Sequence, residues 1–600
     1  MQNKTGYILG ISRGHNSGVC LLKDGEIVFA IEEERLSRQK YDGSPLAAMK
    51  KVLDYTNKVD AMVVVHTQSI DGMAAKIEYT GDDMYTGYAR KLGLIDRKTD
   101  LRNHYQVHDF SKRHHTAHAA LAFYHSGFED AVAVVADGAG SCFFLNSGED
   151  VWEVESIYDC SYKDGITAVF KHMGSRHPIP TGLQPDAPGG LIDQEKPFMN
   201  LVSDHAGITK SYEAVTEYCG FSAIEAGKTM GLFPYGKPSN KLPSLMDTDS
   251  KFMLTNRNTI VPTYPNSAIF NAGIYDYFDT LPQPGQDLTL MENRRDAAYW
   301  IQQETQQAML NYILTACEMT GKKKVVLSGG YGLNCVANYW YLTELNKRGI
   351  ELYVEPISND GGTAIGAALL YYYETSKDTT PRQRQGSLYL GPKYDYTNDD
   401  FVKANEKYKN AEITDNVEYA DIIKLLRSKN IVTMYQGRCE NGPRALGNRS
   451  ILFDPTFKDG KDYVNMVKRR EYFRPFAASV LEEDAKEWFD LRGMDKTPHM
   501  MYAVNCQEGV AEKVPSVIHE DGTCRIQTVS KEENKVYYEL ISEFKKETGV
   551  PLLFNTSFNL GGEPLVETLE DAFWTLDQSD LEYCYFPEYK KLVKIPNTQK

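Results

Sequence analysis

The stretch that decides the fold is "YILGISRGHNSGVCLLKDGEIVFAIEEE", residues 7–34. It predicts an apolar strand, a glycine-containing turn and a hairpin, because Asp24-Gly25 is a strong signal for a tight reversal between two strands. A similar pattern returns at 131–156, "AVAVVADGAGSCFFLNSGEDVWEVES", with a second hairpin around Ser147-Gly148. The repetition predicts two related halves.

Two further glycine turns each lead from a strand into a helix, at 323–345 ("KKVVLSGGYGLNCVANYWYLTEL") and at 355–374 ("EPISNDGGTAIGAALLYYYE"). Strands that alternate with long helices indicate an α/β fold. Hairpin units followed by strand–glycine–helix turns suggest the facing halves of an actin-like ATPase. Backbone N–H groups at such helix starts can bind phosphate without a lysine, and the Walker A pattern is absent. The candidate nucleotide-binding residues are Gly329, Gly330, Gly332, Asn334, Gly361 and Gly362.

Length and composition predict more than one domain. A chain of 600 residues exceeds what one hydrophobic core normally serves. The polar stretch 376–390, interrupted by proline and glycine, is the expected linker between a large domain at 1–375 and a smaller α/β domain at 391–600.

The net charge and the apolar pattern limit the partners. A charge of −16 argues against a broad nucleic-acid or anionic-membrane surface. We expect no membrane span and no signal peptide. The ten cysteines form no CxxC pair, so we expect a cytoplasmic protein with reduced thiols. The mixed-charge run 32–38 is expected to be solvated helix surface.

A possible metal site begins in "RHHTAHAALAFYHSGF", residues 113–128. On a helix, His114 and His118 project from one face, because they are four residues apart. Asp137 and Asp360, each followed by glycine at a predicted strand end, are natural oxygen ligands for a divalent transition metal. Chance spacing of structural histidines is the alternative.

Positive charge gathers in the second domain. "GRCENGPRALGNRS", residues 437–450, is too rich in glycine, proline and arginine for an ordinary helix or strand. The segment 467–480 adds further lysine and arginine. Arginine's planar fork suits phosphate oxygens, so the pattern predicts an anion site, with some of the arginines in ordinary salt bridges. The candidates are Arg438, Arg444, Arg449, Lys468, Arg474 and Arg525, with Asn555 and Ser557 as uncharged donors.

The order of these motifs resembles the O-carbamoyltransferases of nodulation-factor, antibiotic and toxin biosynthesis. The resemblance runs over nearly the whole chain and includes "HHTAHAALAF", "VADGAG", "EAGKTMGLFPYG", "GRCENGPRALGNRSIL", "KRREYFRPFAASV" and "NTSFNLGGEPLV". It implies a Kae1-like, actin-like N-terminal domain followed by a YrdC-like domain.

The resemblance also implies a two-step reaction. Carbamoyl phosphate and ATP with Mg²⁺ would form carbamoyl-adenylate in the C-terminal domain, through the basic candidates above. The carbamoyl group would then pass to an acceptor hydroxyl beside a metal held by His114, His118, Asp137 and Asp360. His15 would be the base. Iron is the expected metal, with Mn²⁺ and Zn²⁺ as alternatives.

Other interpretations remain open at this stage. The acceptor would be a sugar, an antibiotic or toxin alcohol, or a hydroxymethyl nucleobase, the one way in which nucleic acid enters. The protein would act as a monomer or homodimer. A tRNA threonylcarbamoyl-type transferase, an actin-like sugar kinase and a non-catalytic nucleotide-binding protein are the alternative functions. Asn16 and Tyr41 depart from the family pattern, where Asp and His are usual.

Overall fold

The computed structural model describes residues 6–67, 83–97, 104–145, 147–184, 198–240, 242–246, 254–271, 282–408 and 410–596. Its contacts divide the chain into two compact units. The first unit comprises Met1–Val28 and Gly43–Gln385, and the second comprises Phe29–Asp42 and Gly386–Lys600. A short N-terminal segment therefore belongs to the unit that is otherwise C-terminal. The boundaries at 375 and 391 stay predictions.

The first unit contains a five-stranded sheet in the order β3–β2–β1–β4–β5. Strand β1 pairs antiparallel with β2 and parallel with β4, and β4 pairs parallel with β5. The boundary between the units falls inside β3. The bounds are β1 (Tyr7–Ser12), β2 (Gly18–Lys23), β3 (Glu26–Glu32), β4 (Ala61–Val65) and β5 (Val107–Asp109).

A larger sheet of the same unit has the order β10–β11–β9–β8–β6–β14–β15, with β7 paired to β8. Its strands are β6 (Asp130–Ala136), β7 (Cys142–Phe144), β8 (Asp150–Ser161), β9 (Gly165–Gly174), β10 (Gly182–Gln184), β11 (Met199–Ser203), β14 (Lys324–Ser328) and β15 (Glu351–Val354). A separate two-stranded ribbon is formed by β12 (Ile260–Val261) and β13 (Ile269–Phe270).

The two sheets repeat one connectivity. Strand β6 pairs antiparallel with β8 and parallel with β14, as β1 does with β2 and β4. Strands β8 and β9 are antiparallel, and β14 and β15 are parallel. The series β9–β8–β6–β14–β15 thus matches β3–β2–β1–β4–β5. This confirms the predicted α/β fold with the paired halves of an actin-like ATPase.

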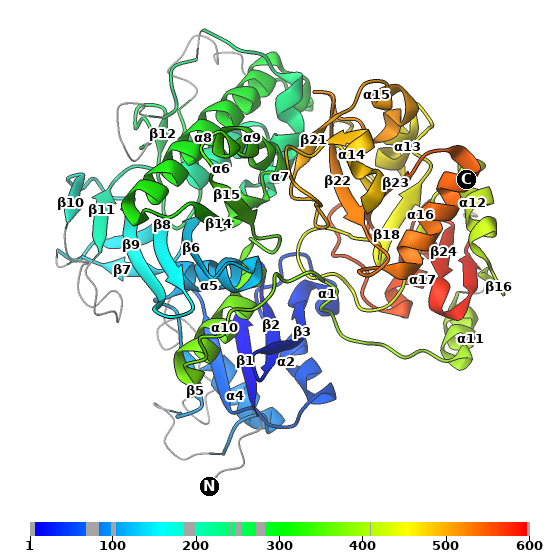
Figure 1. Ribbon diagram of the computed structural model, residues 1–600, viewed down its shortest axis with the longest axis horizontal. Coiled ribbons are helices and arrows are strands. Elements are labelled where there is room, and N and C mark those ends of the chain that lie inside the picture. The colour runs from blue at the N-terminus through cyan, green and yellow to red at the C-terminus, as the bar shows by residue number, and fades with distance from the viewer. Residues whose placement is uncertain are drawn as a thin grey trace. The chain divides into compact units, whose positions relative to one another are not determined.

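Helices α5 (His114–Ser126) and α10 (Thr363–Ser376) lie between these two sheets (Figure 1). The approach is close because glycine removes side chains at the contacts. A Cβ on Gly10 of β1 would lie 2.0 Å from the carbonyl oxygen of Ala364, and one on Gly366 would lie 2.0 Å from that of Ala117. Helix α5 ends at Ser126, and the left-handed φ of 78° at Gly127 suits a glycine C-cap.

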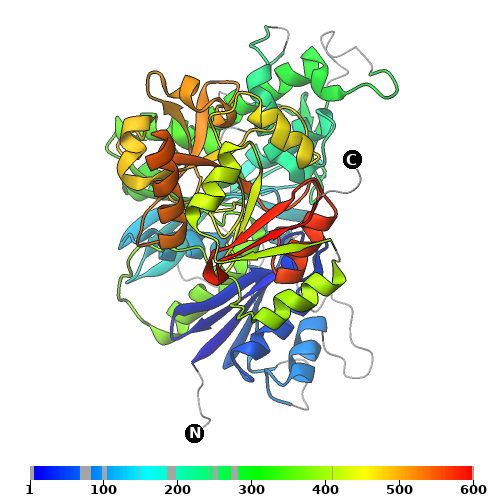
Figure 2. The ribbon, with the colours of Figure 1, turned by 90° about the vertical axis from the view of Figure 1, so that its right-hand side faces the viewer.

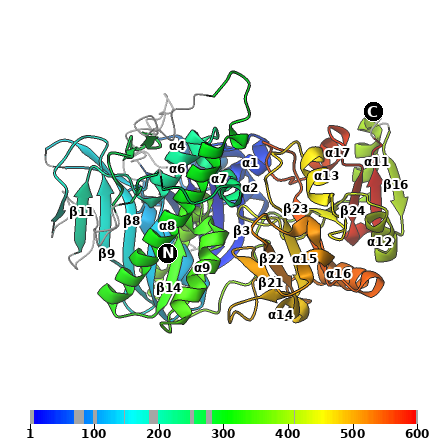
Figure 3. The same ribbon diagram turned by 90° about the horizontal axis from the view of Figure 1, so that it is seen from above.

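Other helices cover the outer surfaces of the first unit. Helices α8 and α9 lie beside the strands of the larger sheet (Figures 1 and 3). The remaining bounds are α2 (Leu46–Lys51), α4 (Met84–Leu92), α6 (Ile208–Tyr218), α7 (Ala226–Leu232), α8 (Glu292–Thr320) and α9 (Cys335–Asn346). Short 3₁₀ turns are η1 (Val52–Asp54), η2 (Ala223–Glu225), η3 (Phe233–Tyr235), η6 (Leu288–Leu290), η7 (Gly330–Leu333) and η8 (Asp360–Gly362).

The second unit is built on a ten-stranded sheet in the order β16–β25–β24–β17–β18–β23–β19–β22–β21–β20. The β24–β25 hairpin and β16 form one end of it (Figure 2). The strands are β16 (Glu412–Asp415), β17 (Val432–Tyr435), β18 (Arg449–Phe453), β19 (Ala477–Leu481), β20 (Phe489–Asp490), β21 (Ala503–Cys506), β22 (Thr523–Val529), β23 (Leu552–Ser557), β24 (Tyr583–Phe586) and β25 (Lys591–Lys594).

Its helices are mostly short. They are α1 (Glu33–Ser37), α11 (Asn398–Lys407), α12 (Tyr419–Arg427), α13 (Gly460–Val467), α14 (Ala485–Trp488), α15 (Val510–Lys513), α16 (Lys535–Thr548) and α17 (Leu569–Asp577), with 3₁₀ turns η9 (Glu482–Asp484), η10 (Pro515–Val517) and η11 (Pro587–Tyr589). Helices α11, α12 and α17 begin with a capping box, which satisfies N–H groups that have no partner inside a helix.

Candidate functional site

The first turns of α5 bring two histidines to two aspartates. His114 Nε2 lies 3.5 Å from Asp137 Oδ2 and 3.5 Å from Asp360 Oδ1. His118 Nε2 lies 3.6 Å from the same oxygen of Asp360. One ligand atom from each of the four residues lies within 4.8 Å of the others. The sequence prediction that these four side chains gather in one place agrees with this geometry.

The topology explains why the aspartates meet. Asp137 directly follows β6, and Asp360 lies in the turn after β15. Strands β6, β14 and β15 are parallel neighbours, so their carboxyl ends share one edge of the sheet. Ligand sites in α/β sheets form at such edges.

The cluster is buried and electrostatically strong. Burial opposes a charged imidazole, but the carboxylates of Asp360 and Asp137 outweigh it and raise the pKa of His114 to about 10. Burial on its own would raise the pKa of Asp360. The neighbouring His114 has the larger effect and holds the pKa of Asp360 well below its ordinary value. The site thus favours positive charge between the carboxylates.

A divalent transition metal fits these residues. The Nε2 atoms of His114 and His118 are buried and make no hydrogen bond within the described part of the chain. Two imidazole nitrogens and two carboxylate oxygens are a donor set that iron, manganese and zinc all accept. A metal ion would take the place of the proton that the carboxylates otherwise favour on His114.

The glycine turns that the sequence singled out adjoin this cluster. The Gly330 N–H donates to Asp137 Oδ1 at 3.0 Å. Gly329 has φ +86°, and a Cβ there would lie 2.2 Å from the Ala136 carbonyl oxygen. A Cβ on Gly332 would lie 2.8 Å from Ser358 Oγ, just before the turn that contains Gly361 and Gly362. Asn334 caps α9 by accepting from the Ala337 N–H and exchanges hydrogen bonds with Gln302.

His15 lies at the edge of the cluster and faces solvent. Its Nδ1 is 3.9 Å from Asp360 Oδ2, and 46% of its side chain is exposed. It follows β1 of the smaller sheet, whereas the four clustered residues belong to α5 and the larger sheet. The turn is tight, since Gly14 has φ +123°. An exposed imidazole beside the buried cluster of histidines and aspartates can reach an incoming molecule.

In the second unit, the arginines of 437–450 act mainly on backbone carbonyls. Arg449 is fully buried, stacks 3.6 Å from the Tyr435 ring centroid and donates to the carbonyl oxygens of Gln436 and Asn448. Arg438 donates to the carbonyls of Leu390 and Gly391. Arg444 is partly buried in the same loop. Arg438 and Arg449 therefore hold the loop, and this is compatible with an anion site nearby.

Glu440 completes this loop and was not anticipated. Its buried carboxylate accepts the N–H groups of Leu446, Asn448 and Arg449 at 2.7, 2.8 and 3.2 Å. One glutamate thereby closes the turn that leads into β18. A glutamate between Cys439 and Asn441 has no sequence signature for this role.

Four cations gather in the second unit, three in the segment 468–474 and one, Arg525, on β22. Lys468 is buried, and burial, with Arg470 and Arg474 adding to it, lowers its pKa well below the ordinary value. Burial also lowers the pKa of Arg470 well below its ordinary value, and the charges of Arg474 and Arg525 lower it further. An arginine keeps its proton in proteins, so the lowered pKa means electrostatic strain. Among the described residues, the ion pair of this cluster is Arg474–Glu471 at 3.4 Å.

Hydrogen bonds connect the cluster to Ser557, and strand pairing connects it to Asn555. Lys468 Nζ donates to the carbonyl and hydroxyl of Ser557 and to Asn559 Oδ1 at 3.1 Å. Asn555 pairs with Ala477, which pairs with Arg525 on the next strand. The Asn555 amide donates to the Ala445 carbonyl at 3.2 Å, so it also ties the strand to the arginine loop. Arg470, which the candidates predicted from the sequence did not include, is the fourth cation of the cluster.

The mixed-charge run 32–38 is not solvated, so that prediction was wrong. Glu32, Glu33, Glu34 and Arg35 are all buried. The Arg35 guanidinium donates to the carbonyls of Glu440 and Gly442, at 3.2 and 2.9 Å, within the arginine loop. Backbone partners, which no periodicity reveals, permit this burial.

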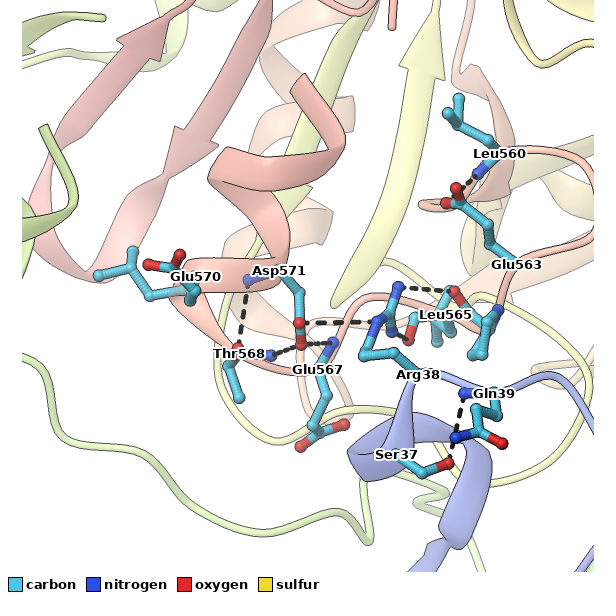
Figure 4. A network of polar contacts seen from close by, with 12 residues as sticks. Ser37, Arg38, Gln39, Leu560, Glu563, Leu565, Glu567, Thr568, Glu570 and Asp571 are labelled. Atoms are coloured by element: carbon cyan, nitrogen blue, oxygen red, sulfur yellow. Dashed lines mark hydrogen bonds and ion pairs between the residues drawn. The ribbon is translucent and has the colours of Figure 1, made fainter. Parts of the chain in front are cut away.

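Arg38 makes a second anchor for the same segment (Figure 4). It donates to the carbonyls of Leu565 and Pro564 and lies 3.6 Å from Asp571. Asp571 also accepts the Thr568 N–H at the start of α17. Because the loop before Pro564 carries Asn559, which contacts Lys468, the segment 29–42 supports both loops beside the cation cluster.

Comparison with known proteins decides the family. The family model described as "Carbamoyltransferase N-terminus" matches residues 7–77 and 65–369, and the model described as "Carbamoyltransferase C-terminus" matches residues 423–591. The chain belongs to the carbamoyltransferase family. It is therefore an enzyme, as the sequence resemblance predicted.

Curated relatives extend over most of this carbamoyltransferase. The nodulation protein NolNO of Sinorhizobium fredii is 30% identical over 95% of the chain and 77% of its own length. The nodulation protein NolO of Bradyrhizobium diazoefficiens is 31% identical over 78% of the chain and 76% of its own length. A crystal structure of full-length HypF is 13% identical, covers 62% of the chain and 55% of its own, and has a TM-score of 0.34, too low to bear on function.

Within the described residues, no helix has both the length and the apolar content needed to cross a bilayer.

Proposed function

We propose that this carbamoyltransferase works in two steps, one in each unit. In the second unit, carbamoyl phosphate and ATP with Mg²⁺ give carbamoyl-adenylate. In the first unit, the carbamoyl group passes to an acceptor hydroxyl. The YrdC-like and Kae1-like domain assignments, at 391–600 and 1–375, belong to this proposal.

The atom balance of the first step requires one water. Water releases phosphate from carbamoyl phosphate and leaves carbamate. A carbamate oxygen then attacks the α-phosphorus of ATP, forming the adenylate and releasing pyrophosphate. Both events move negative charge between phosphate oxygens, so fixed cations nearby lower their barriers.

The observation that carries the proposal is the cluster of Lys468, Arg470, Arg474 and Arg525. Burial and repulsion from neighbouring cations destabilise the charges of Lys468 and Arg470 in the free protein. A bound phosphate or pyrophosphate would relieve that strain and supply charge-assisted hydrogen bonds. Ser557 and Asn555 would orient the ligand and the neighbouring loop. Arg438, Arg444 and Arg449 would contribute through the loop 437–450.

In the second step, His15 would take the proton from the acceptor hydroxyl. Its exposure and its 3.9 Å separation from Asp360 support this role as a base beside the proposed metal site. A metal held by His114, His118, Asp137 and Asp360 would supply Lewis-acid polarisation of the carbamoyl or phosphate oxygens. The acceptor oxygen forms a bond to the carbamoyl carbon, AMP leaves, and the proton resides on His15.

The nucleotide would lie along the glycine turns. The turns at 329–332 and 361–362 are close to the metal ligands and precede α9 and α10, whose starts offer N–H groups. Asn334 would hold this turn through its cap on α9. Iron is our proposed metal, and the acceptor is a sugar, an antibiotic or toxin alcohol, or a hydroxymethyl nucleobase.

The test separates the two steps. Protein, ATP, Mg²⁺ and carbamoyl phosphate should yield pyrophosphate and carbamoyl-adenylate, detected by mass spectrometry without an acceptor. The His15→Ala variant should form the adenylate at the wild-type rate and fail to carbamoylate alcohols from an acceptor screen, with a loss of about 10²–10⁴-fold. ATP consumption that does not depend on carbamoyl phosphate would overturn the first step. Loss of both activities in His15→Ala would overturn the division between units.

A further inference from the structure

A fully buried ion pair lies beneath the metal-ligand helix. Glu153 on β8 and Lys171 on β9 are both 0% exposed and pair directly. Lys171 also donates to the Tyr158 hydroxyl at 2.9 Å, and that hydroxyl accepts from Thr116 of α5. Neither charge reaches solvent, and neither belongs to the reaction proposed above.

The Glu153 carboxylate contacts two separate segments. Oε1 pairs with Lys171, while Oε2 accepts the Ser141 N–H at 2.9 Å and the His115 N–H at 3.4 Å. Ser141 Oγ accepts in turn from the His114 N–H at 3.1 Å. The end of the loop that begins at Asp137 and the first turn of α5 therefore meet at one carboxylate.

The packing leaves little freedom at this junction. A Cβ on Gly140 would lie 2.6 Å from His115 Nε2 and 2.8 Å from Glu153 Oε2. The Gly140 N–H donates to the Glu153 carbonyl, and the Glu153 N–H donates to the Ser141 carbonyl. The loop is thus attached to β8 by main chain as well as by side chain. Its geometry sets where Asp137 stands relative to His114.

A contribution to folding stability does not by itself explain the buried Glu153–Lys171 pair. Removing two charges from water costs about as much as their attraction returns, and apolar residues of similar size often replace such pairs without loss. The pair remains charged: burial opposes ionisation, but Lys171 outweighs it and lowers the pKa of Glu153 to about 2. A carboxylate that accepts two N–H groups fixes a spacing that an apolar side chain does not.

We propose that Glu153, held by Lys171, is a positioning residue that sets the spacing of the metal ligands on α5 and in the Asp137 loop. The inference rests on the proposed function only in requiring that this cluster binds a metal. It assigns a role to residues outside the ligand set.

The test measures metal binding and folding separately. The double variant Glu153→Leu/Lys171→Met removes both charges and keeps the volume, and the metal-free protein is titrated with Co²⁺ while its absorption bands are recorded. Groups that orient metal ligands typically contribute about 10- to 100-fold to metal affinity. We expect a loss of that size and altered cobalt bands, with the melting temperature of the metal-free protein retained.

A matched control comes from the same two strands. Glu155 on β8 is buried, pairs with His172 on β9 at 2.7 Å and accepts the Ile208 N–H at the start of α6. Because its carboxylate contacts β9 and the start of α6, Glu155→Gln should bind Co²⁺ as the wild type does.

Each outcome decides something. Unchanged Co²⁺ affinity and bands in the folded double variant overturn the positioning role and leave the proposed function intact. A wild-type protein that binds no Co²⁺ refutes the metal centre and this inference with it. If the double variant does not fold, Glu153→Gln decides, because a folded Glu153→Gln protein with wild-type affinity also overturns the role.

Discussion

Replacing Lys468 by methionine separates the effect of this charge on the stability of the free protein from its effect on phosphate binding. The side chain keeps its length and loses the ammonium. In the free protein, burial, Arg470 and Arg474 all oppose that charge. Against this stand the lost hydrogen bonds to Ser557 and Asn559. We expect the two effects to offset within about 1 kcal/mol, so the melting temperature without ligand should stay within about 4 °C of wild type.

With phosphate bound, the balance changes. A hydrogen bond to a charged group contributes about 1.5–3 kcal/mol, which corresponds to about 10- to 150-fold weaker phosphate binding in Lys468→Met. At 100 times its dissociation constant, a ligand adds about 2.7 kcal/mol of stability. For a unit of this size that is a rise of about 5–11 °C in the wild type. A 50-fold weaker variant would gain about 0.65 kcal/mol, or about 1–3 °C.

The assay is thermal unfolding with and without inorganic phosphate, followed by isothermal titration with carbamoyl phosphate. Arg469→Gln is the control, because Arg469 is exposed, adjacent in sequence and bonded to the Gln578 carbonyl. It should keep the wild-type response. A Lys468→Met protein that retains the full phosphate-induced rise would refute the assignment of Lys468 to the anion site.

Two more predictions concern charge in the metal-free protein and the N-terminal segment. Because the pKa of His114 is raised to about 10, its contribution to stability is fully present below its unfolded value of 6.5 and is lost as pH rises toward 10. The melting temperature of the wild type in a chelator should therefore fall across this pH range. The His114→Gln variant should lack this fall. A variant that keeps the wild-type pH profile would contradict the assignment to His114. Arg38→Gln should lower the free energy of unfolding of the second unit by about 1–3 kcal/mol, since it loses two carbonyl contacts and the Asp571 pair. Urea titration measures this, and a variant as stable as wild type would show that Arg38 does not support the loop.

The cluster of two histidines and two aspartates could be predicted from the sequence because local rules place its members. Four-residue spacing puts His114 and His118 on one helix face, and Asp-Gly after an apolar strand marks a strand end. Parallel pairing then brings those strand ends together. The repeated hairpin predicted the two matching sheets for the same reason, since the residues that form a turn are neighbours in the sequence.

The second unit was harder to predict, because an arginine's partner is not encoded near it. Arg449 and Arg470 look alike in sequence. One is buried against backbone carbonyls and the Tyr435 ring, while the other lies among cations. The same limit applies to Arg35, whose carbonyl partners are 405 and 407 positions away along the chain.

The placement of 29–42 also bears on how the polypeptide can be divided. The chain passes from one unit to the other after Val28, returns after Asp42 and crosses again after Gln385. Cleavage in the stretch 376–390 would consequently leave the units joined by two peptide strands. A fragment that starts at Gly386 would lack the guanidinium groups that Glu440, Gly442, Pro564 and Leu565 accept from. The second unit is a single compact body made from two pieces of chain, and a separate gene for it would have to encode both.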